Sequence, residues 1–441
     1  MKLFYVLIIF VFLPNCSFDN KSGIWKDINS ISEKNNDEFK DFKTITVDDN
    51  FFKKIISKNN DFTFKLERPR DNYNWRDIFY NKQNNSANFA YNDTNKVIYK
   101  SKKISRYNIN NQFLLDDGNF IFADAKGNIL IFSREKNKII NKFNFYKKRY
   151  KKIKKKINLI IENNIIYVSD NLSFLYAYDY KNKNLIWAKN YKIPFRSNLK
   201  IFDNKLIAAN QNNILYFFNK FNGELLKKIP TEETSFKNEF INNLASTERS
   251  LFYLNTYGSL YSINQKNLSI DWFINLNQSK DINPNNLFNG NEIIVHSEKI
   301  IITSNKNLYI INAFNGSTLF KSNIIAAFRP IAVSENLFTV TKNNLLIALN
   351  LKNGNIIYSI DLNKKISAYL NTKKKIAKFK SFMIINNKIF IFLKNSYYIK
   401  LDIYGEIEEI NKLPSKIHSN PIISEKSLLY LSNKNKIFIV N

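Results

Sequence analysis

The chain has 441 residues, a formal net charge of +30 and one cysteine, Cys16. A single cysteine excludes disulfide bonds within the chain, so packing alone must hold the fold, and the length allows a large core. So basic a chain suggests nucleic acid as a partner, but the N-terminus argues against that interpretation.

Residues 1–15 have the character of a secretory signal peptide. The apolar stretch 3–13 is too short to span a bilayer, which needs about twenty residues. Residues 13–16, Leu-Pro-Asn-Cys, are similar to a bacterial lipobox, which implies a lipid on Cys16. Ser17 follows, and the absence of Asp there favours the outer membrane. An ordinary signal peptide with a chance cysteine is the alternative.

Residues 16–62 are polar and rich in Asn, Asp, Lys and Ser. This composition predicts a lipidated flexible tether, with a short helix over 48–57 as an option. An exported, tethered protein meets little nucleic acid, so we expect no nucleic-acid partner.

One short apolar sequence motif, similar to Asn-x-Leu-Tyr-Ile-Ile-Asn, recurs eight times. Successive copies start 38 to 52 residues apart, and this spacing with strand-like content is typical of a β-propeller with one copy per blade. The copies are residues 127–133, 173–179, 213–219, 258–264, 306–312, 344–350, 396–402 and 435–441.

Each copy lies in a longer frame that predicts four short strands. Another apolar run precedes the motif by about ten residues, and a turn and a further apolar run follow the motif. Three of these turns contain Asn-Gly, which favours tight hairpins because both residues tolerate positive φ. The run after the turn carries an aromatic residue that we expect to pack in the core. Examples are Trp187, Trp272, Phe320 and Tyr358.

The last copy ends at Asn441 after its third strand, so a fourth strand must come from elsewhere. Residues 94–105 have the right character, with Tyr99 at the aromatic position. The sequence therefore predicts an all-β, eight-bladed propeller of four-stranded antiparallel blades over residues 63–441. Its ring would be closed by an N-terminal strand that completes blade eight.

Residues 147–156 contain eight basic residues in ten and fall between the first and second blades. A solvated loop, contact with anionic lipid head groups and contact with an acidic partner are all compatible with this cluster. We attribute much of the remaining charge to the Lys-, Asn- and Ile-rich bias of an AT-rich genome.

The sequence gives no support for catalysis. His296 and His418 belong to different blades, and neither has a metal-ligand partner at suitable spacing. There is no glycine-rich phosphate loop and no nucleophile elbow. We therefore expect no catalytic residues, no metal and no cofactor.

The repeat Leu-Tyr-x-x-Asn-x-x-Asn-Gly, best seen in 213–226, 306–320 and 344–358, resembles that of pyrroloquinoline-quinone-type propellers. The lipobox, the tether, the eight blades and the Trp75-containing segment 74–99 also resemble one lipoprotein family, the BamB family of the outer-membrane β-barrel assembly machinery. The resemblance implies a non-catalytic scaffold at the periplasmic face of the outer membrane. Such a scaffold would assist folding and insertion of β-barrel proteins, and its clients would be unfolded outer-membrane proteins.

In that family the propeller docks onto the periplasmic domains of the barrel-inserting subunit. It does so through an apolar–Arg pair in one inter-blade loop and acidic residues in the next. The resemblance assigns the apolar positions to Ile193 and Phe195, the arginine to Arg196 and the first acid to Glu239. The second acidic position holds Ile241, which departs from the family pattern.

Two alternatives remain. A quinone-dependent dehydrogenase would need acidic calcium ligands and, in that group of enzymes, a vicinal disulfide, whereas this chain has only Cys16. A propeller that binds envelope glycans would retain polysaccharide without a barrel-assembly partner.

Overall fold

The computed structural model describes residues 16–18, 25–27, 51–58, 62–234, 241–277 and 287–441. The chain divides into two units, residues 1–50 and 51–441. In the first unit, β1 (Cys16–Phe18) pairs antiparallel with β2 (Trp25–Asp27). The expected signal peptide, 1–15, lies outside the described residues. Within the described ranges, no helix has the length and apolar character needed to cross a membrane.

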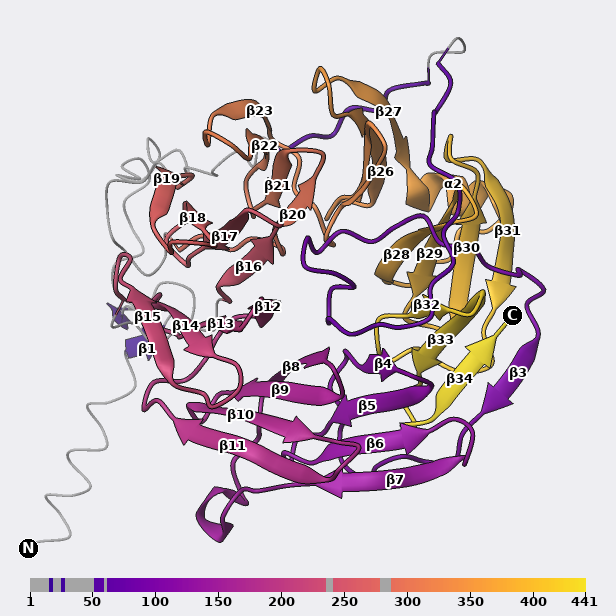
Figure 1. Cartoon of the computed structure of the whole chain (residues 1–441). Helices are drawn as coiled ribbons and strands as arrows, with labels where there is room; N and C mark the ends of the chain where they lie inside the picture. The colour runs from indigo at the N-terminus through magenta and orange to yellow at the C-terminus, as the bar shows by residue number, and fades with distance from the viewer. Residues whose placement is uncertain (1–15, 19–24, 28–50, 59–61, 235–240, 278–286) are drawn as a thin grey trace, which may run out of the picture. The chain divides into compact units, whose positions relative to one another are not determined.

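The second unit consists of eight four-stranded antiparallel sheets arranged around a centre, as predicted (Figure 1). In each blade the first strand lies innermost and the fourth outermost. Blades one to four comprise β4 (Leu114–Asp116), β5 (Asn119–Ala123), β6 (Ile129–Ser133), β7 (Lys138–Phe143); β8 (Ile157–Glu162), β9 (Ile165–Asp170), β10 (Phe174–Asp179), β11 (Asn184–Asn190); β12 (Lys200–Phe202), β13 (Lys205–Ala209), β14 (Leu215–Asn219), β15 (Leu225–Ile229); and β16 (Asn243–Ser246), β17 (Ser250–Leu254), β18 (Ser259–Asn264), β19 (Ile270–Asn275).

The other four blades repeat this order. They comprise β20 (Ile294–His296), β21 (Lys299–Thr303), β22 (Leu308–Asn312), β23 (Thr318–Ser322); β24 (Ile331–Val333), β25 (Asn336–Val340), β26 (Leu345–Asn350), β27 (Ile356–Asp361); β28 (Phe379–Ile385), β29 (Lys388–Leu393), β30 (Tyr397–Leu401), β31 (Ile407–Lys412); and β32 (Ile422–Ser424), β33 (Ser427–Leu431), β34 (Ile437–Val440), completed by β3 (Val97–Lys100). The helices of the described chain are short: the α-helix α2 (Leu362–Tyr369), capped by Asp361, and the 3₁₀ turn η2 (Lys148–Tyr150).

The predicted closure is confirmed. Strand β3 pairs antiparallel with β34, and Tyr99 lies opposite Ile439. Just outside the strands, Lys96 and Asn441 exchange backbone hydrogen bonds of 3.0 and 2.9 Å. The start of the propeller thus supplies the outer strand of its last blade, which leaves the ring without an open end.

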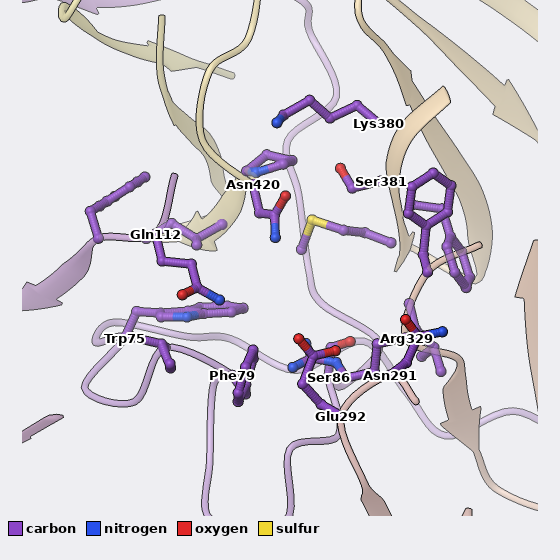
Figure 2. A pocket seen from close by; sticks show the side chains of 18 of the residues that line it. Trp75, Phe79, Ser86, Gln112, Asn291, Glu292, Arg329, Lys380, Ser381 and Asn420 are labelled. Atoms are coloured by element: carbon purple, nitrogen blue, oxygen red, sulfur yellow. The ribbon is translucent and has the colours of Figure 1, made fainter. Parts of the chain in front are cut away.

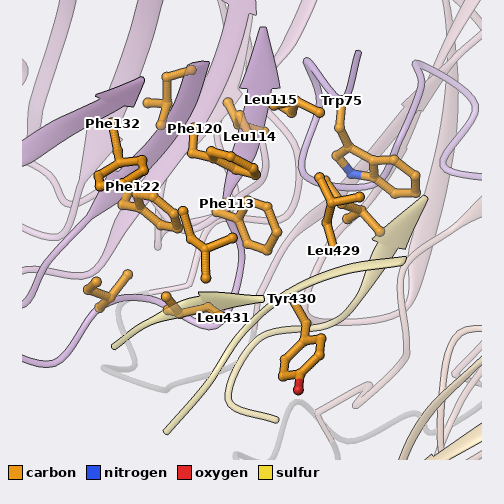
Figure 3. Packing of buried hydrophobic residues seen from close by; sticks show 14 of the residues in the cluster. Trp75, Phe113, Leu114, Leu115, Phe120, Phe122, Phe132, Leu429, Tyr430 and Leu431 are labelled. Atoms are coloured by element: carbon orange, nitrogen blue, oxygen red, sulfur yellow. The ribbon is translucent and has the colours of Figure 1, made fainter. Parts of the chain in front are cut away.

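The hydrophobic core is divided into layers between neighbouring blades. Middle strands such as β6 and β33 are buried along their whole length, as expected for sheets packed on both faces. Figure 3 shows one such layer, in which Phe113 and Phe122 of blade one lie near Leu429 and Leu431 of blade eight.

The Asn-Gly turns and the aromatic residues of the repeat belong to one contact between blades. Gly223, in the turn after the third strand of blade three, has φ of +71°, and a Cβ there would lie 2.5 Å from Trp187 of blade two. The indole Nε1 of Trp187 donates a 2.9 Å hydrogen bond to the carbonyl of Lys220 in the same turn. Gly316 and Gly354 meet Trp272 and Phe320 in the same way. The motif therefore requires glycine because the aromatic ring occupies the space of a side chain.

The antiparallel order gives the propeller two distinct faces. The turns between first and second strands and between third and fourth strands lie on one side, which we call the turn face. The turns between second and third strands and the loops between blades lie on the other, which we call the loop face. Bridges such as Ile109–Asp124 and Ile417–Ser432 join these loops and turns within a blade.

The segment that leads to β3 crosses the centre of the ring at the turn face, a path that the sequence did not predict (Figure 1). This central segment, residues 70–92, contacts the first strand of every blade through a hydrogen bond. The bonds join Trp75 N to Leu115 O, Ile161 N to Arg76 O, Lys200 Nζ to Asp77 Oδ2, Ser246 N to Lys82 O, Val295 N to Gln83 O, Asn85 Nδ2 to Ala332 O, Phe89 N to Ile384 O and Asn72 Nδ2 to Ile423 O. The segment therefore fastens all eight blades to one another.

Residues 51–58 contain no helix, contrary to the option of a helix over 48–57; positions 48–50 lie outside the described residues. The backbone N of Phe52 instead donates to the carbonyl of Asn323 at 3.0 Å, and Ile56 pairs with Ser359 of β27. The chain thus contacts blade six before residue 63, where we expected the propeller to begin. Phe52 lies on the loop face, because Asn323 belongs to an inter-blade loop.

Candidate functional site

The loop between blades two and three carries three of the partner-binding candidates, Ile193, Phe195 and Arg196. Phe195 is 3% exposed, which differs from the anchor role that the resemblance implied. It pairs with Asn210 as in a sheet and packs against the rings of Tyr191 and Phe218. The strand-like pairing turns the phenyl ring inward, so the side chain of Phe195 packs in the blade interior.

Arg196 and Ile193 remain partly exposed on this loop. The backbone of Arg196 is fixed on both sides, because its N donates to Ala209 O at 3.0 Å and its carbonyl accepts from Asn242 N at 2.8 Å. Its guanidinium Nε is buried without a hydrogen-bond partner, and no carboxylate among the described residues pairs with it. Because the side chain of Arg196 is partly exposed on a fixed backbone, it is suited to meet a carboxylate from outside.

The next inter-blade loop meets the first one. Ser197 forms a parallel bridge with Asn242, and Asn242 Nδ2 donates to Asn210 O at 2.7 Å. Glu239, the predicted acidic candidate, lies outside the described residues. Ile241, the position that departs from the family pattern, is 62% exposed. The described apolar candidate beside Arg196 is therefore Ile241, which sequence comparison alone had set aside.

Another acid of this second loop has a structural role. Glu232 accepts hydrogen bonds from Ser259, Tyr261 and Asn255, each 2.7 Å long. Burial alone would raise the pKa of Glu232, but the hydrogen bonds from Ser259, Tyr261 and Asn255 bring it below the ordinary value. Glu232 therefore holds the loop against blade four as a carboxylate.

A cavity of about 220 Å³ occupies the centre of the ring next to the central segment. Trp75, Phe79, Glu292, Arg329 and Lys380 surround it (Figure 2). The guanidinium of Arg329 lies 4.9 Å from the ring of Phe79, and its Nη1 lacks a hydrogen-bond partner. Burial lowers the pKa of Arg329, whereas the charges of Glu292 and Asp77 raise it.

The lining of this cavity does not fit a quinone and its calcium ion. Calcium takes six to eight oxygen ligands, usually with several carboxylates. Glu292 is the one carboxylate that lines the cavity, and no cluster of three potential ligands occurs in the described ranges. Cys16, the chain's single cysteine, excludes the vicinal disulfide implied for such enzymes.

Both histidines make local hydrogen bonds to neighbouring chain segments. His296 Nε2 lies 2.7 Å from Ser334 O, and His418 Nε2 lies 2.8 Å from Ile109 O. Each therefore serves packing between a blade and its surroundings.

The basic loop 147–156 is folded back onto blades one and two. Lys155 is 1% exposed, with its Nζ 5.0 Å from the ring of Tyr146 and bonded to the carbonyl of Tyr150. Asn171 Nδ2 donates to Lys154 O at 3.1 Å. The other basic residues of the loop are exposed on this fixed support.

Comparison with known proteins accords with this architecture. The sequence model of the family described as outer membrane protein assembly factor BamB matches residues 125–359, more than half of the chain. The chain belongs to this BamB family. A search of curated proteins returned no match.

Solved structures share the fold at low sequence identity. BamB from Moraxella catarrhalis has a TM-score of 0.61 at 11% identity, over 78% of this chain and 99% of that one. The computationally designed Ika8 protein gives 0.58 at 8% identity, over 78% and 99% of the two chains. Quinohemoprotein alcohol dehydrogenase from Comamonas testosteroni gives 0.59 at 8% identity, over 83% and 80%. BamB, a designed protein and a quinohemoprotein enzyme thus share this propeller fold.

Proposed function

We propose that this chain is a non-catalytic, lipid-anchored scaffold of outer-membrane β-barrel assembly. It would act at the periplasmic face of the outer membrane, held there by a lipid on Cys16 that follows the signal peptide 1–15. Its contribution would be to bind and position the barrel-inserting subunit and unfolded barrel proteins. Membership of the BamB family supports this role.

The observation that carries the proposal is the pair of joined loops on blades two to four. Arg196 has an unsatisfied Nε and a backbone fixed by Asn242, and the exposed Ile241 directly precedes Asn242. An exposed apolar side chain beside an arginine that pairs with no described carboxylate is a common hot-spot chemistry. A partner surface with a carboxylate next to an apolar pocket would complement this pair.

The test is affinity purification from detergent-solubilised membranes with Arg196→Glu and Ile241→Asp variants of the full chain. Each should reduce recovery of the barrel-inserting subunit by tenfold or more, because hot-spot changes cost about 2 kcal/mol or more. Lys192→Glu is the matched control, since Lys192 is an exposed cation of the same loop. Unchanged recovery with both variants would remove these loops from the interface.

The quinone-dehydrogenase alternative draws on the shared fold with the quinohemoprotein. The single carboxylate at the central cavity is our reason for preferring a scaffold. The alternative predicts quinone absorbance and calcium-dependent dye reduction after reconstitution of the purified chain. We expect neither.

A further inference from the structure

The basic residues of the propeller are distributed unequally between its two faces. On the loop face over blades seven, eight, one and two, Asp124 and Asp170 lie where β5 and β9 end, and both are buried. Six further segments there contain lysine and arginine but no aspartate or glutamate. We call them the basic sector: residues 370–378, 394–396, 413–421, 432–436, 101–113 and 144–156.

Most charges of the basic sector are exposed and lack an ion-pair partner among the described residues. Every Lys and Arg of the sector is exposed except the buried Lys155 and the partly buried Lys436. Leaving Lys156 aside, none of them forms an ion pair with another described residue. These charges repel one another across the sector, and a surface of opposite sign would relieve that repulsion.

On the turn face, by contrast, acids neutralise the bases. Asp116 pairs with Arg76, Asp117 with Lys181 at 3.3 Å, Glu335 with Lys352, and Glu425 with Arg134 at 2.7 Å. Compositional bias acts on all surface positions alike, so it does not account for an excess of unpaired positive charge on one face. The contrast indicates that the loop face meets an anionic surface.

Apolar side chains project among the charges of the basic sector. Ile153, between Lys152 and Lys154, is 43% exposed, and Leu370, just before the lysines at 373–375, is 48% exposed. Tyr107, which follows Arg106, is also exposed. Apolar and aromatic tips flanked by basic residues are suited to the boundary between lipid head groups and acyl chains.

The chain also enters the propeller at this face. Phe52 is bonded to Asn323 and to Asn343, two residues of the loop face of blade six, beside the basic sector. Residues 16–50 lie between the proposed lipid on Cys16 and this point. A lipid on Cys16 would therefore hold the propeller near the bilayer, but it would not by itself specify which face turns toward the membrane.

We propose that the basic sector docks the propeller onto anionic phospholipid head groups, with this part of the loop face toward the bilayer. This proposal deepens the proposed lipid anchorage and rests on it for the identity of the membrane. The tether would supply proximity, and the basic sector would supply orientation. The loops at 191–199 and 241–243 belong to the same face but lie over blades two to four, outside the six segments of the sector.

The test uses the full chain with Cys16→Ser, so that no acyl chain contributes to binding. Vesicles of phosphatidylcholine alone are compared with vesicles that also contain phosphatidylglycerol, by flotation. We expect binding to the anionic vesicles only, and release as salt shortens the Debye length from about 8 Å to about 3 Å. Equal binding to both kinds of vesicle, or to neither, would overturn the proposal.

A charge-matched pair of variants locates the surface. The sector variant carries Lys148→Gln, Arg149→Gln, Lys151→Gln and Lys152→Gln. The control carries Lys136→Gln, Lys183→Gln, Lys266→Gln and Lys352→Gln, all exposed on the turn face. The first should weaken partitioning by on the order of a hundredfold or more, and the control by far less.

Equal losses from the two variants would contradict a specific face. Circular dichroism melting of both variants identifies any loss due to unfolding. Retention by polyglutamate without flotation on anionic vesicles would assign the sector to an acidic protein and overturn the lipid assignment. Because no partner subunit is present, failure here is distinguishable from failure of the proposed scaffold role.

Discussion

The Nζ atom of Lys200, at the start of β12, lies 2.6 Å from Oδ2 of Asp77 in the central segment, and both side chains are buried. Lys200 also donates to Asn84 Oδ1 at 2.6 Å and to Asn81 O at 3.1 Å. One lysine therefore holds three residues of the central segment against blade three. Burial lowers the pKa of Lys200, while the charge of Asp77 acts in the opposite direction.

Removal of either partner of this pair should destabilise the propeller strongly. Lys200→Met leaves the Asp77 carboxylate buried without a compensating charge, and Asp77→Asn does the same to the Lys200 ammonium group. Each substitution should lower the free energy of unfolding by about 3–5 kcal/mol. The double variant should cost clearly less than the sum of the two, because no isolated charge remains. Urea unfolding of the four proteins measures this coupling, and strict additivity would show that the pair does not act as a unit.

The contact between Gly223 and Trp187 can be separated from the backbone strain at the same glycine. Gly118 has φ of +72°, nearly that of Gly223, but nothing lies within 4 Å of a Cβ built there. Gly118→Ala should cost about 1–2 kcal/mol for the left-handed conformation alone. Gly223→Ala should cost a further 1–3 kcal/mol or so, because its Cβ meets the Trp187 ring.

The difference in unfolding free energy between these two alanine variants is the quantity to measure. Equal losses would mean that the indole moves aside freely and that the blade contact contributes little.

Ring closure by β3 predicts unequal effects of two deletions. Loss of residues 94–105 removes β3 and exposes the edge of β34, whereas loss of residues 20–45 removes none of the described propeller. The first deletion should lower the melting temperature far more than the second. Differential scanning calorimetry checks this, and equal melting temperatures would refute closure.

Glu232 predicts part of the acid sensitivity of the fold. The pKa of Glu232 is lower in the folded protein than in the unfolded chain, so its stabilisation is present above the unfolded pKa. That stabilisation is lost as pH falls through the folded pKa. Glu232→Gln should therefore be less stable than the parent protein at neutral pH and approach it in acid. Melting temperatures from pH 7 down to about pH 3 measure the effect.

Glu233→Gln is the matched control for this prediction, since Glu233 is exposed and its nearest cation, Lys228, is 3.7 Å away. Its melting profile should follow that of the parent protein. A parallel profile for Glu232→Gln would show that the hydrogen bonds from Ser259 and Tyr261 do not lower the pKa.

The fold was predictable because each blade repeats the same local chemistry. The apolar motif and the apolar run before it recur in all eight copies, and three copies add an Asn-Gly turn, so the copies reinforce one interpretation. Even the closing strand followed from a count, since the last repeat ends at Asn441 without a fourth strand. The role of the central segment in joining the blades was not predicted, because this segment has no periodicity. Its bonds use backbone groups and amides such as Asn84 and Asn85, whose partners are distant in sequence.

The candidate site was harder to predict because exposure depends on tertiary contacts. Phe195 looked like a surface anchor, but pairing with Asn210 turns it inward. Ile241 looked like a defect in an acidic motif, yet it is the exposed apolar residue of the joined loops. The unequal distribution of charge between the two faces could not be read from the sequence, because only the strand order shows that residues near 102, 149 and 374 share a face.

Affinity purification of the lipidated full chain from detergent-solubilised membranes tests the scaffold role most directly. The barrel-inserting subunit of the outer-membrane assembly machinery should be recovered with the propeller. Arg196→Glu should reduce this recovery and leave the melting temperature unchanged. Recovery of the intact propeller from membranes without that subunit would contradict the proposed scaffold role.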